Sequence, residues 1–146
     1  MIAVPFGGCD QGWVIALRVG AVAHFVLVGL NLGIARWLNW KPEIDRMSPL
    51  VREVFQIHSI FLMLVLGIWG VLTWRFAEEM VVAPTELSRW LSGALMVFWG
   101  LRTVMQWTHY STHHWRGVWH RTVVHWVLFL SYGTGAFIYG VVAFRT

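Results

Sequence analysis

The sequence predicts an all-α membrane protein, built as an up-down bundle of four transmembrane helices. Hydrophobic residues make up 58% of the 146 residues and charged residues only 12%, about half the charged fraction of an average soluble domain. The hydrophobic residues are gathered in four long stretches that short charged segments separate. A soluble domain of this length needs more polar surface, whereas lipid can face apolar side chains directly. We therefore expect a single transmembrane domain over residues 1–146.

Each hydrophobic stretch is long enough for a spanning helix, which needs about 20 residues. The four stretches cover approximately residues 13–38, 54–74, 90–110 and 122–144. Backbone groups in lipid need hydrogen-bond partners within their own segment, so helices are expected. Pro42, Pro49 and Pro84 lie between the stretches and interrupt helix continuation. Short connections make consecutive helices antiparallel neighbours, which gives the up-down arrangement.

Tryptophans mark the predicted ends of the spans. Indole rings favour the interface between membrane and water, so this placement predicts an aromatic belt in contact with membrane lipids. The residues are Trp37, Trp40, Trp74, Trp90, Trp107, Trp115 and Trp119.

The basic residues predict the orientation of the helices. The side that holds the first and third connections carries Arg36, Lys41, Arg46, Arg52, Arg116 and Arg121. The opposite side carries Arg18, Arg75, Arg89 and Arg145. The positive-inside rule then places the first and third connections in the cytoplasm and both termini outside it.

Polar residues inside the spans are candidates for a functional site, because they are costly in lipid. Arg102, Gln106 and His109 follow one stripe of the third helix. The nearest acidic partner for Arg102 is Glu53, at the start of the second helix; carbonyls, Asn31, water or an anionic ligand are the alternatives. Arg102 either binds a ligand or bonds backbone carbonyls and fixes one helix to another.

His58 and His125 begin the second and fourth helices at a similar depth, roughly 5–6 Å inside the membrane. Two imidazoles from facing helices could ligate the iron of a b-type haem or bond a quinone carbonyl. Equally, both could be ordinary residues of the interface. His24, near the middle of the first helix, is a further cofactor-binding candidate, although a lone histidine is more often a packing residue.

The third connection contains His109, His113 and His114, followed by His120. Imidazoles at positions i and i+4 lie on one helical face and can share a metal ion. This fragment resembles one histidine box of the membrane fatty-acid hydroxylase and desaturase family, which holds two irons. That family uses more histidines than the seven present here, so the resemblance covers one box and implies at most a single metal. The alternative is a histidine-rich turn that helps to hold anionic lipid.

Two further segments carry a resemblance over the stretch from His24 to the end of the chain. Gln56-Ile57-His58-Ser59 and Phe98-Trp99-Gly100-Leu101-Arg102 are similar to segments of uncharacterised small four-helix membrane proteins of bacteria. The resemblance implies a bacterial cytoplasmic (inner) membrane and brings no activity with it.

These observations favour a small, non-catalytic membrane subunit or accessory protein of a larger complex, with other membrane subunits as partners. The competing hypotheses are a redox protein for electron transport that binds haem b or a quinone, and a histidine-ligated metal enzyme acting on a lipid-like substrate. Nucleic acid is not expected as a partner, because the arginines stand singly at span ends and form no basic run.

Overall fold

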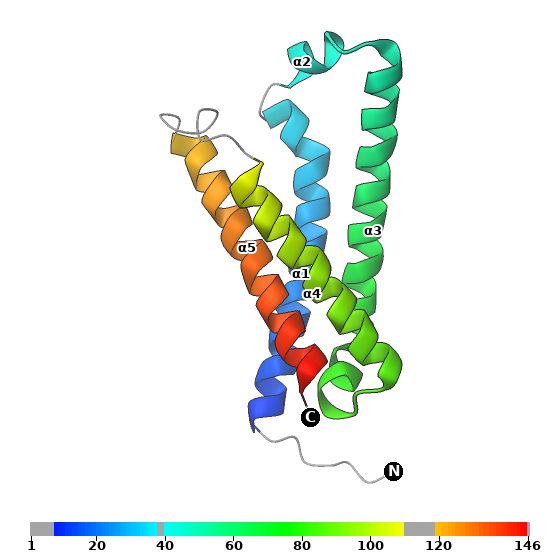
Figure 1. The fold of residues 1–146 in the computed structure, drawn as a ribbon, viewed down its shortest axis with the longest axis vertical. Coiled ribbons are helices and arrows are strands. Elements are labelled where there is room, and N and C mark those ends of the chain that lie inside the picture. Colours follow the sequence, from blue (N-terminus) through cyan, green and yellow to red (C-terminus); the bar gives the residue numbers. More distant parts are fainter. Residues whose placement is uncertain (1–7, 38–39, 110–118, 146) are drawn as a thin grey trace. The chain divides into compact units, whose positions relative to one another are not determined.

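The computed structural model describes residues 8–37, 40–109 and 119–145, including their side chains except those of residues 34–37, 120 and 121. The elements are α1 (Gly8–Trp37), α2 (Lys41–Asp45), α3 (Pro49–Val82), α4 (Glu86–Thr108) and α5 (Trp119–Phe144). The described residues form no β-strand, and Figure 1 shows the helical ribbon. The predicted all-α class is therefore confirmed.

Two of the prolines between the predicted spans stand at the beginnings of helices. Pro42 lies in the first turn of α2, and Pro49 is the first residue of α3. A helix leaves its first backbone N–H groups without partners, so a residue that lacks this group fits there. As a result, α3 begins five residues before the predicted boundary, and it continues to Val82, just before Pro84.

Helix α3 is longer than the hydrophobic stretch that predicted it. Its 34 residues correspond to about 51 Å at the rise of an α-helix. The hydrocarbon core of a bilayer is about 30 Å thick, so part of α3 extends beyond the core if the helix crosses it. High hydropathy marks the part of such a helix that lies in the bilayer core, but not the polar turns at its ends. The range predicted from hydropathy is therefore shorter than the helix.

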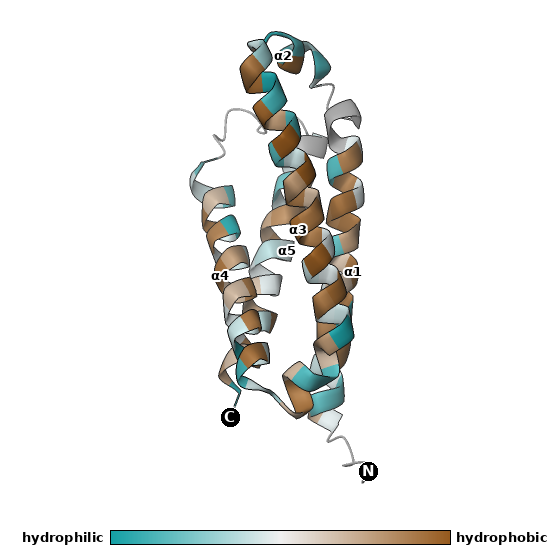
Figure 2. Ribbon diagram, turned by 90° about the vertical axis from the view of Figure 1, so that its right-hand side faces the viewer, coloured by the Kyte–Doolittle hydropathy of each residue, from teal (hydrophilic) through white to brown (hydrophobic). Residues whose placement is uncertain are grey.

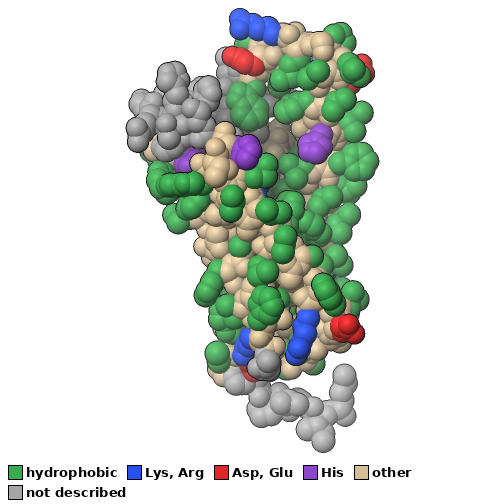
Figure 3. Space-filling model, in the orientation of Figure 1, with side chains coloured by type: hydrophobic (Ala, Val, Ile, Leu, Met, Phe, Trp, Pro, Cys, Tyr) green, Lys and Arg blue, Asp and Glu red, His purple; other side chains and the backbone are tan. Residues whose placement is uncertain are grey.

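Among the described residues, three helices are long and apolar enough to cross a membrane: Gly8–Gly33, Pro49–Val82 and Thr122–Phe144. Figure 2 shows hydrophobic residues along most of α1 and α3. In Figure 3, hydrophobic side chains cover the middle of the visible helices, and most charged side chains lie near helix ends. Helix α4 is long enough, but serines, Arg102 and Gln106 lower its hydropathy. The structure thus supports a membrane protein with three clear candidate spans.

The contacts divide the chain into two compact units. One unit contains residues up to Leu17 and from Phe76 onward. Within it, α4 and α5 pack against each other as an antiparallel pair (Figure 1). The start of α1 joins the end of α5: Arg145 Nη2 donates to Asp10 Oδ1 at 2.6 Å, and the rings of Trp13 and Phe137 lie 6.4 Å apart. This ion pair places the first turn of α1 beside the last turn of α5.

The second unit comprises residues 18–75 and contains most of α1 and α3. The two helices approach closely at Gly70. A Cβ atom built on Gly70 would lie 3.1 Å from Phe25 Cζ, 3.2 Å from His24 Cβ and 3.3 Å from the carbonyl oxygen of Ala21. One turn away, the guanidinium of Arg18 lies 5.9 Å from the ring centre of Trp74. The absence of a side chain at Gly70 therefore permits the close contact between α1 and α3.

The polar helix pair as candidate functional site

Helix α4 presents one buried stripe toward its neighbours. The helix starts at a capped end, where the Thr85 side chain accepts a hydrogen bond from the backbone N–H of Ser88 at 3.2 Å. Its buried residues are Ser88, Ser92, Leu95, Trp99 and Gln106. These positions are three, four or seven residues apart, so they share one face of the helix. Four of these five side chains carry a polar atom.

Gln106 meets His125 of α5 across this face. Gln106 Nε2 and His125 Nδ1 lie 3.0 Å apart, and only 4% and 6% of the two residues are exposed. With the amide nitrogen donating, Nδ1 of a neutral imidazole accepts and the ring proton lies on Nε2. The hydrogen bond thereby fixes the orientation of the histidine ring within the helix pair.

Arg102 meets an aromatic pair one turn along α4. Its guanidinium carbon lies 5.6 Å from the ring centre of Tyr132. The same tyrosine ring stacks on Trp99, with centres 5.2 Å apart and an interplanar angle of 22°. A cation near an aromatic face is attracted by the ring's quadrupole. The half-buried Arg102 thus has a partner on α5, and this partner is an aromatic ring.

A seven-residue spacing connects these contacts. Trp99 lies seven residues before Gln106, and Tyr132 lies seven residues after His125. One further step of seven in each direction reaches Ser92 and Tyr139, which are also buried. Seven residues return to nearly the same helical face after two turns. The pairs therefore lie in successive layers of one antiparallel interface, separated by about 10.5 Å along the helices.

Small residues of α5 let the two helices approach each other between the layers. A Cβ atom on Gly135 would lie 3.5 Å from Trp99, and one on Gly140 would lie 3.1 Å from Met96 Sδ. The glycines at these two positions therefore serve close packing of the two helices.

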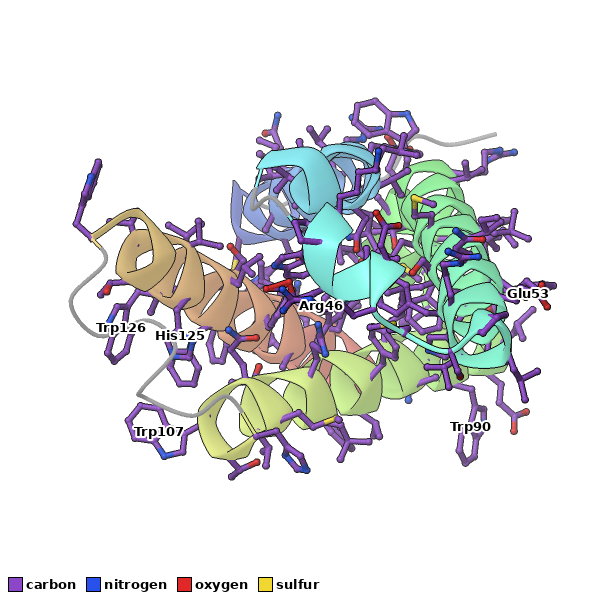
Figure 4. The ribbon with its side chains drawn as sticks, turned by 90° about the horizontal axis from the view of Figure 1, so that it is seen from above. Arg46, Glu53, Trp90, Trp107, His125 and Trp126 are labelled. Atoms are coloured by element: carbon purple, nitrogen blue, oxygen red, sulfur yellow. The ribbon has the colours of Figure 1, made fainter. Side chains whose placement is uncertain are left out.

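At the end of the pair that carries Gln106 and His125, two exposed tryptophans and the half-buried Phe129 form an aromatic cluster. The ring centres of Trp107 and Trp126 are 6.3 Å apart, and Phe129 lies 5.6 Å and 5.8 Å from them. Figure 4 shows Trp107 on α4 and Trp126 on α5 beside His125. Of the tryptophans predicted to form the belt, those that the structure describes are all exposed: Trp40, Trp74, Trp90, Trp107 and Trp119. Trp74 lies within α3, eight residues before Val82, and the other four lie at or near helix ends. Exposed indoles near helix ends are typical of a membrane interface.

The remaining candidate residues have different surroundings. His24 is buried, with 2% exposed, and its Nδ1 lies 2.8 Å from the carbonyl oxygen of Gly20 in the same helix. His58 is exposed on α3. It belongs to the unit of residues 18–75, whereas His125 belongs to the other unit, so the predicted ligand pair stays a prediction. The same holds for the predicted pairing of Arg102 with Glu53.

The structure describes the histidine-rich connection between α4 and α5 only at its two ends. His109 follows the last turn of α4, is exposed, and lies 2.8 Å from Thr108 Oγ1 through its Nδ1. His113 and His114 lie outside the described residues, as does the side chain of His120. Within the described part of the chain, no three His, Cys, Asp or Glu side chains are placed to hold one metal ion. The predicted metal site at His109, His113, His114 and His120 therefore stays a prediction.

The sequence indicated Gln106, His125 and Arg102 as candidate site residues. It did not indicate the stacked pair of Trp99 and Tyr132 beside Arg102. Trp99 and Tyr132 looked like ordinary apolar residues of the spans. The signal that could have revealed them is the seven-residue spacing within Ser92, Trp99 and Gln106, matched by His125, Tyr132 and Tyr139. Two helices that carry the same period can align their polar and aromatic residues in layers.

The helices and their polar layers define a helical protein suited to a membrane. Comparisons with protein-family models, with curated proteins and with solved structures found no match. The function therefore has to be argued from the residues themselves.

Proposed function

We propose that this chain is a four-span, up-down protein of the bacterial inner membrane that serves as a non-catalytic subunit or accessory protein of a larger membrane complex. Helix α4 would be the additional span. Its polar residues face α5 in part, through Gln106 and Arg102, and such contacts lower the cost of placing them in the bilayer. The ion pair between Asp10 and Arg145 supports an arrangement in which both termini lie at the same membrane face.

The observation that carries this proposal is the exposed surface of α3. Leu50, Val54, Ile57, Phe61, Leu64, Ile68 and Val71 are exposed and alternate at intervals of four and three residues. This spacing follows one face of a helix and is typical of helix pairs that pack along a shared seam. Next to it, Gln56 and His58 are exposed as well.

Exposed polar side chains of α3 beside this face favour a protein partner over lipid alone. Amide and imidazole groups can form hydrogen bonds between membrane helices, whereas lipid tails offer them no partner. Gln56 and His58 lie in the first third of α3. Because α3 is longer than the hydrocarbon core is thick, this part of the helix would lie near the membrane surface, where a partner's helix can supply polar groups. The surface of α3 thus fits a helix of another membrane subunit.

The test is the size of the native assembly in a mild detergent. Wild-type protein, extracted from its own membrane, is expected to migrate as a complex much larger than one chain. Gln56→Leu together with His58→Leu should release the single chain, whereas the control Val127→Leu, at an exposed position of α5, should leave the complex intact. A wild-type protein that runs as one chain would contradict the proposal.

A second candidate function is redox chemistry with a bound haem or quinone, and one observation favours it. The amide of Gln106 holds His125 at Nδ1. With the amide oxygen turned to accept from Nδ1–H, Nε2 would be the nitrogen that ligates iron, as in histidines that bind metals. An optical spectrum of the purified protein separates the two proposals. A reduced b-type absorption band that His125→Ala abolishes would replace the first proposal with the second, and a colourless protein that stays in its complex supports the first.

A further inference from the structure

The exposed face of α3 carries a heptad pattern, whose seven positions are lettered a to g. Its apolar residues recur at alternating intervals of four and three, which places them at the a and d positions. Val54, Phe61 and Ile68 occupy a positions, and Leu50, Ile57, Leu64 and Val71 occupy d positions. These residues are called the α3 seam below. The seam is about 32 Å long, enough to follow a partner helix through most of a bilayer.

The contacts of α3 with its own chain use the opposite side of the helix. Leu66 and Thr73 occupy f positions of the same heptads, and they are only 4% and 0% exposed. Gly70, at a c position, makes the close approach to α1. The residues of the α3 seam, by contrast, are between 48% and 70% exposed. Because f positions point away from a and d, the helix can bind α1 on one side and a further helix along the seam.

Two ionisable residues beside the seam indicate which helix fits there. Glu53 occupies a g position and His58 the e position of the next heptad, and both are exposed. In a parallel pair of helices, a g residue lies beside the e residue five positions later on the partner. A second α3, parallel and in register, therefore brings Glu53 of each copy to His58 of the other. In an antiparallel pair, g would face g, and the two Glu53 carboxylates would repel each other.

The membrane and the seam both favour this parallel arrangement. Identical chains insert with the same topology, so their α3 helices run in the same direction. Val54 and Ile68 at a, with Leu50 and Leu64 at d, form the combination that favours two parallel strands, although the other three seam residues depart from it. A two-fold axis along the seam would produce the pair of Glu53 and His58 twice.

We propose that the α3 seam binds the α3 seam of a second copy of this chain, in parallel and in register, with Glu53 and His58 paired across the interface. In each pair, an imidazole N–H of His58 donates to the carboxylate of Glu53. Such a partner lowers the cost of placing both groups in or near the bilayer. This inference rests on the proposed function, since it names the partner of the surface assigned there.

Disulfide cross-linking in the native membrane tests the seam. In a Cys9→Ser background, Ile57→Cys should give covalent dimers on oxidation with copper phenanthroline, because equivalent d positions of the two copies face each other. Leu64→Cys, two turns further along, should do the same. The matched control is Phe55→Cys, at an exposed b position of the same helix, which should remain mainly monomeric. Equal cross-linking at all three positions overturns the inference.

A charge exchange tests the pairing and the register. Glu53→Lys alone and His58→Glu alone should each weaken the dimer roughly fivefold, because each puts like charges together in both pairs. The double variant restores opposite charges and should regain the dissociation constant of wild type. Arg52→Glu, at an f position away from the seam, is the control for a changed charge. Förster transfer between fluorescent proteins fused after residue 146, measured on dilution in detergent, gives the dissociation constants. A double variant as weak as the single ones overturns the pairing.

The composition of the extracted complex separates this inference from the proposed function. Two differently tagged copies of the full chain are produced in the same cells, and the complex is captured through one tag. Recovery of the second tag supports the inference. A large complex that contains one tag only would show that another subunit occupies the seam, which overturns the inference and leaves the proposed function standing. A dimer of this chain with no other protein supports the inference and contradicts the larger complex.

Discussion

Gln106 and His125 lie nineteen residues apart in the chain and share a buried hydrogen bond of 3.0 Å between α4 and α5. The bond gives each of these two buried polar side chains a partner on the facing helix. It also fixes the register of the pair, since only one alignment brings an amide and an imidazole together. In the next layer of the same alignment, Trp99 stacks on Tyr132.

The energy of this hydrogen bond can be measured by a double-mutant cycle. Gln106→Leu and His125→Leu should each destabilise the protein, because each leaves a buried polar group without its partner. The coupling energy between the two changes is expected to be about 0.6–1.7 kcal/mol, the range known for hydrogen bonds between membrane helices. Reversible unfolding in mixed detergent micelles gives the four free energies. A coupling energy near zero would show that the pair does not stabilise the fold.

The antiparallel register of α4 and α5 predicts a specific cross-link. Met96 and Gly140 face each other closely, so Met96→Cys with Gly140→Cys should cross-link readily in a background where Cys9 is replaced by serine. The pair Met96→Cys with Phe137→Cys is the control, because the side chain of Phe137 is 65% exposed. Gel mobility after mild oxidation reports both. Equal cross-linking of the two pairs would argue against the register.

The close approach of α1 and α3 should be sensitive to a single methyl group. Gly70→Ala places a carbon 3.3 Å from the backbone oxygen of Ala21 and closer still to Phe25 and His24. Overpacking of this kind costs about 1–3 kcal/mol. Gly67→Ala adds the same methyl group to the same helix where nothing lies within 4 Å, so the comparison cancels the change in helix propensity. If thermal unfolding shows both variants to be equally stable, the two helices do not pack as described.

The transmembrane role of α4 can be decided by reporter fusions. With four spans, a reporter after residue 146 and one inserted at residues 83–85, between α3 and α4, should lie on the same side of the membrane. If α4 lies on the surface and only the other three long helices cross, the two reporters should lie on opposite sides. A periplasmic phosphatase and a cytoplasmic fluorescent protein, fused in parallel at each position, distinguish the two topologies. Opposite sides would refute the four-span arrangement.

The sequence by itself determined the helical class and the approximate positions of the long helices. Apolar stretches of about 20 residues specify spanning helices through backbone hydrogen bonds that are local to each segment. Helix ends were less accurate, as Pro49 and Val82 show for α3, because a helix can continue through polar turns that hydropathy does not detect. For α4, the composition leaves the membrane assignment open, since Arg102 and Gln106 lower the hydropathy of a helix that is otherwise long enough.

Only the tertiary structure decided which polar residue has which partner. Sequence spacing placed Arg102 and Gln106 on one stripe of α4, but it offered Glu53 as a partner for Arg102 and His58 as a partner for His125. The structure places Arg102 beside the ring of Tyr132 and His125 beside the amide of Gln106, while the pairings with Glu53 and His58 stay predictions. Periodicity is a property of one helix, whereas a contact depends on how two helices are aligned and rotated against each other. That alignment results from packing at small residues such as Gly135 and Gly140, and it exists only once the helices have come together.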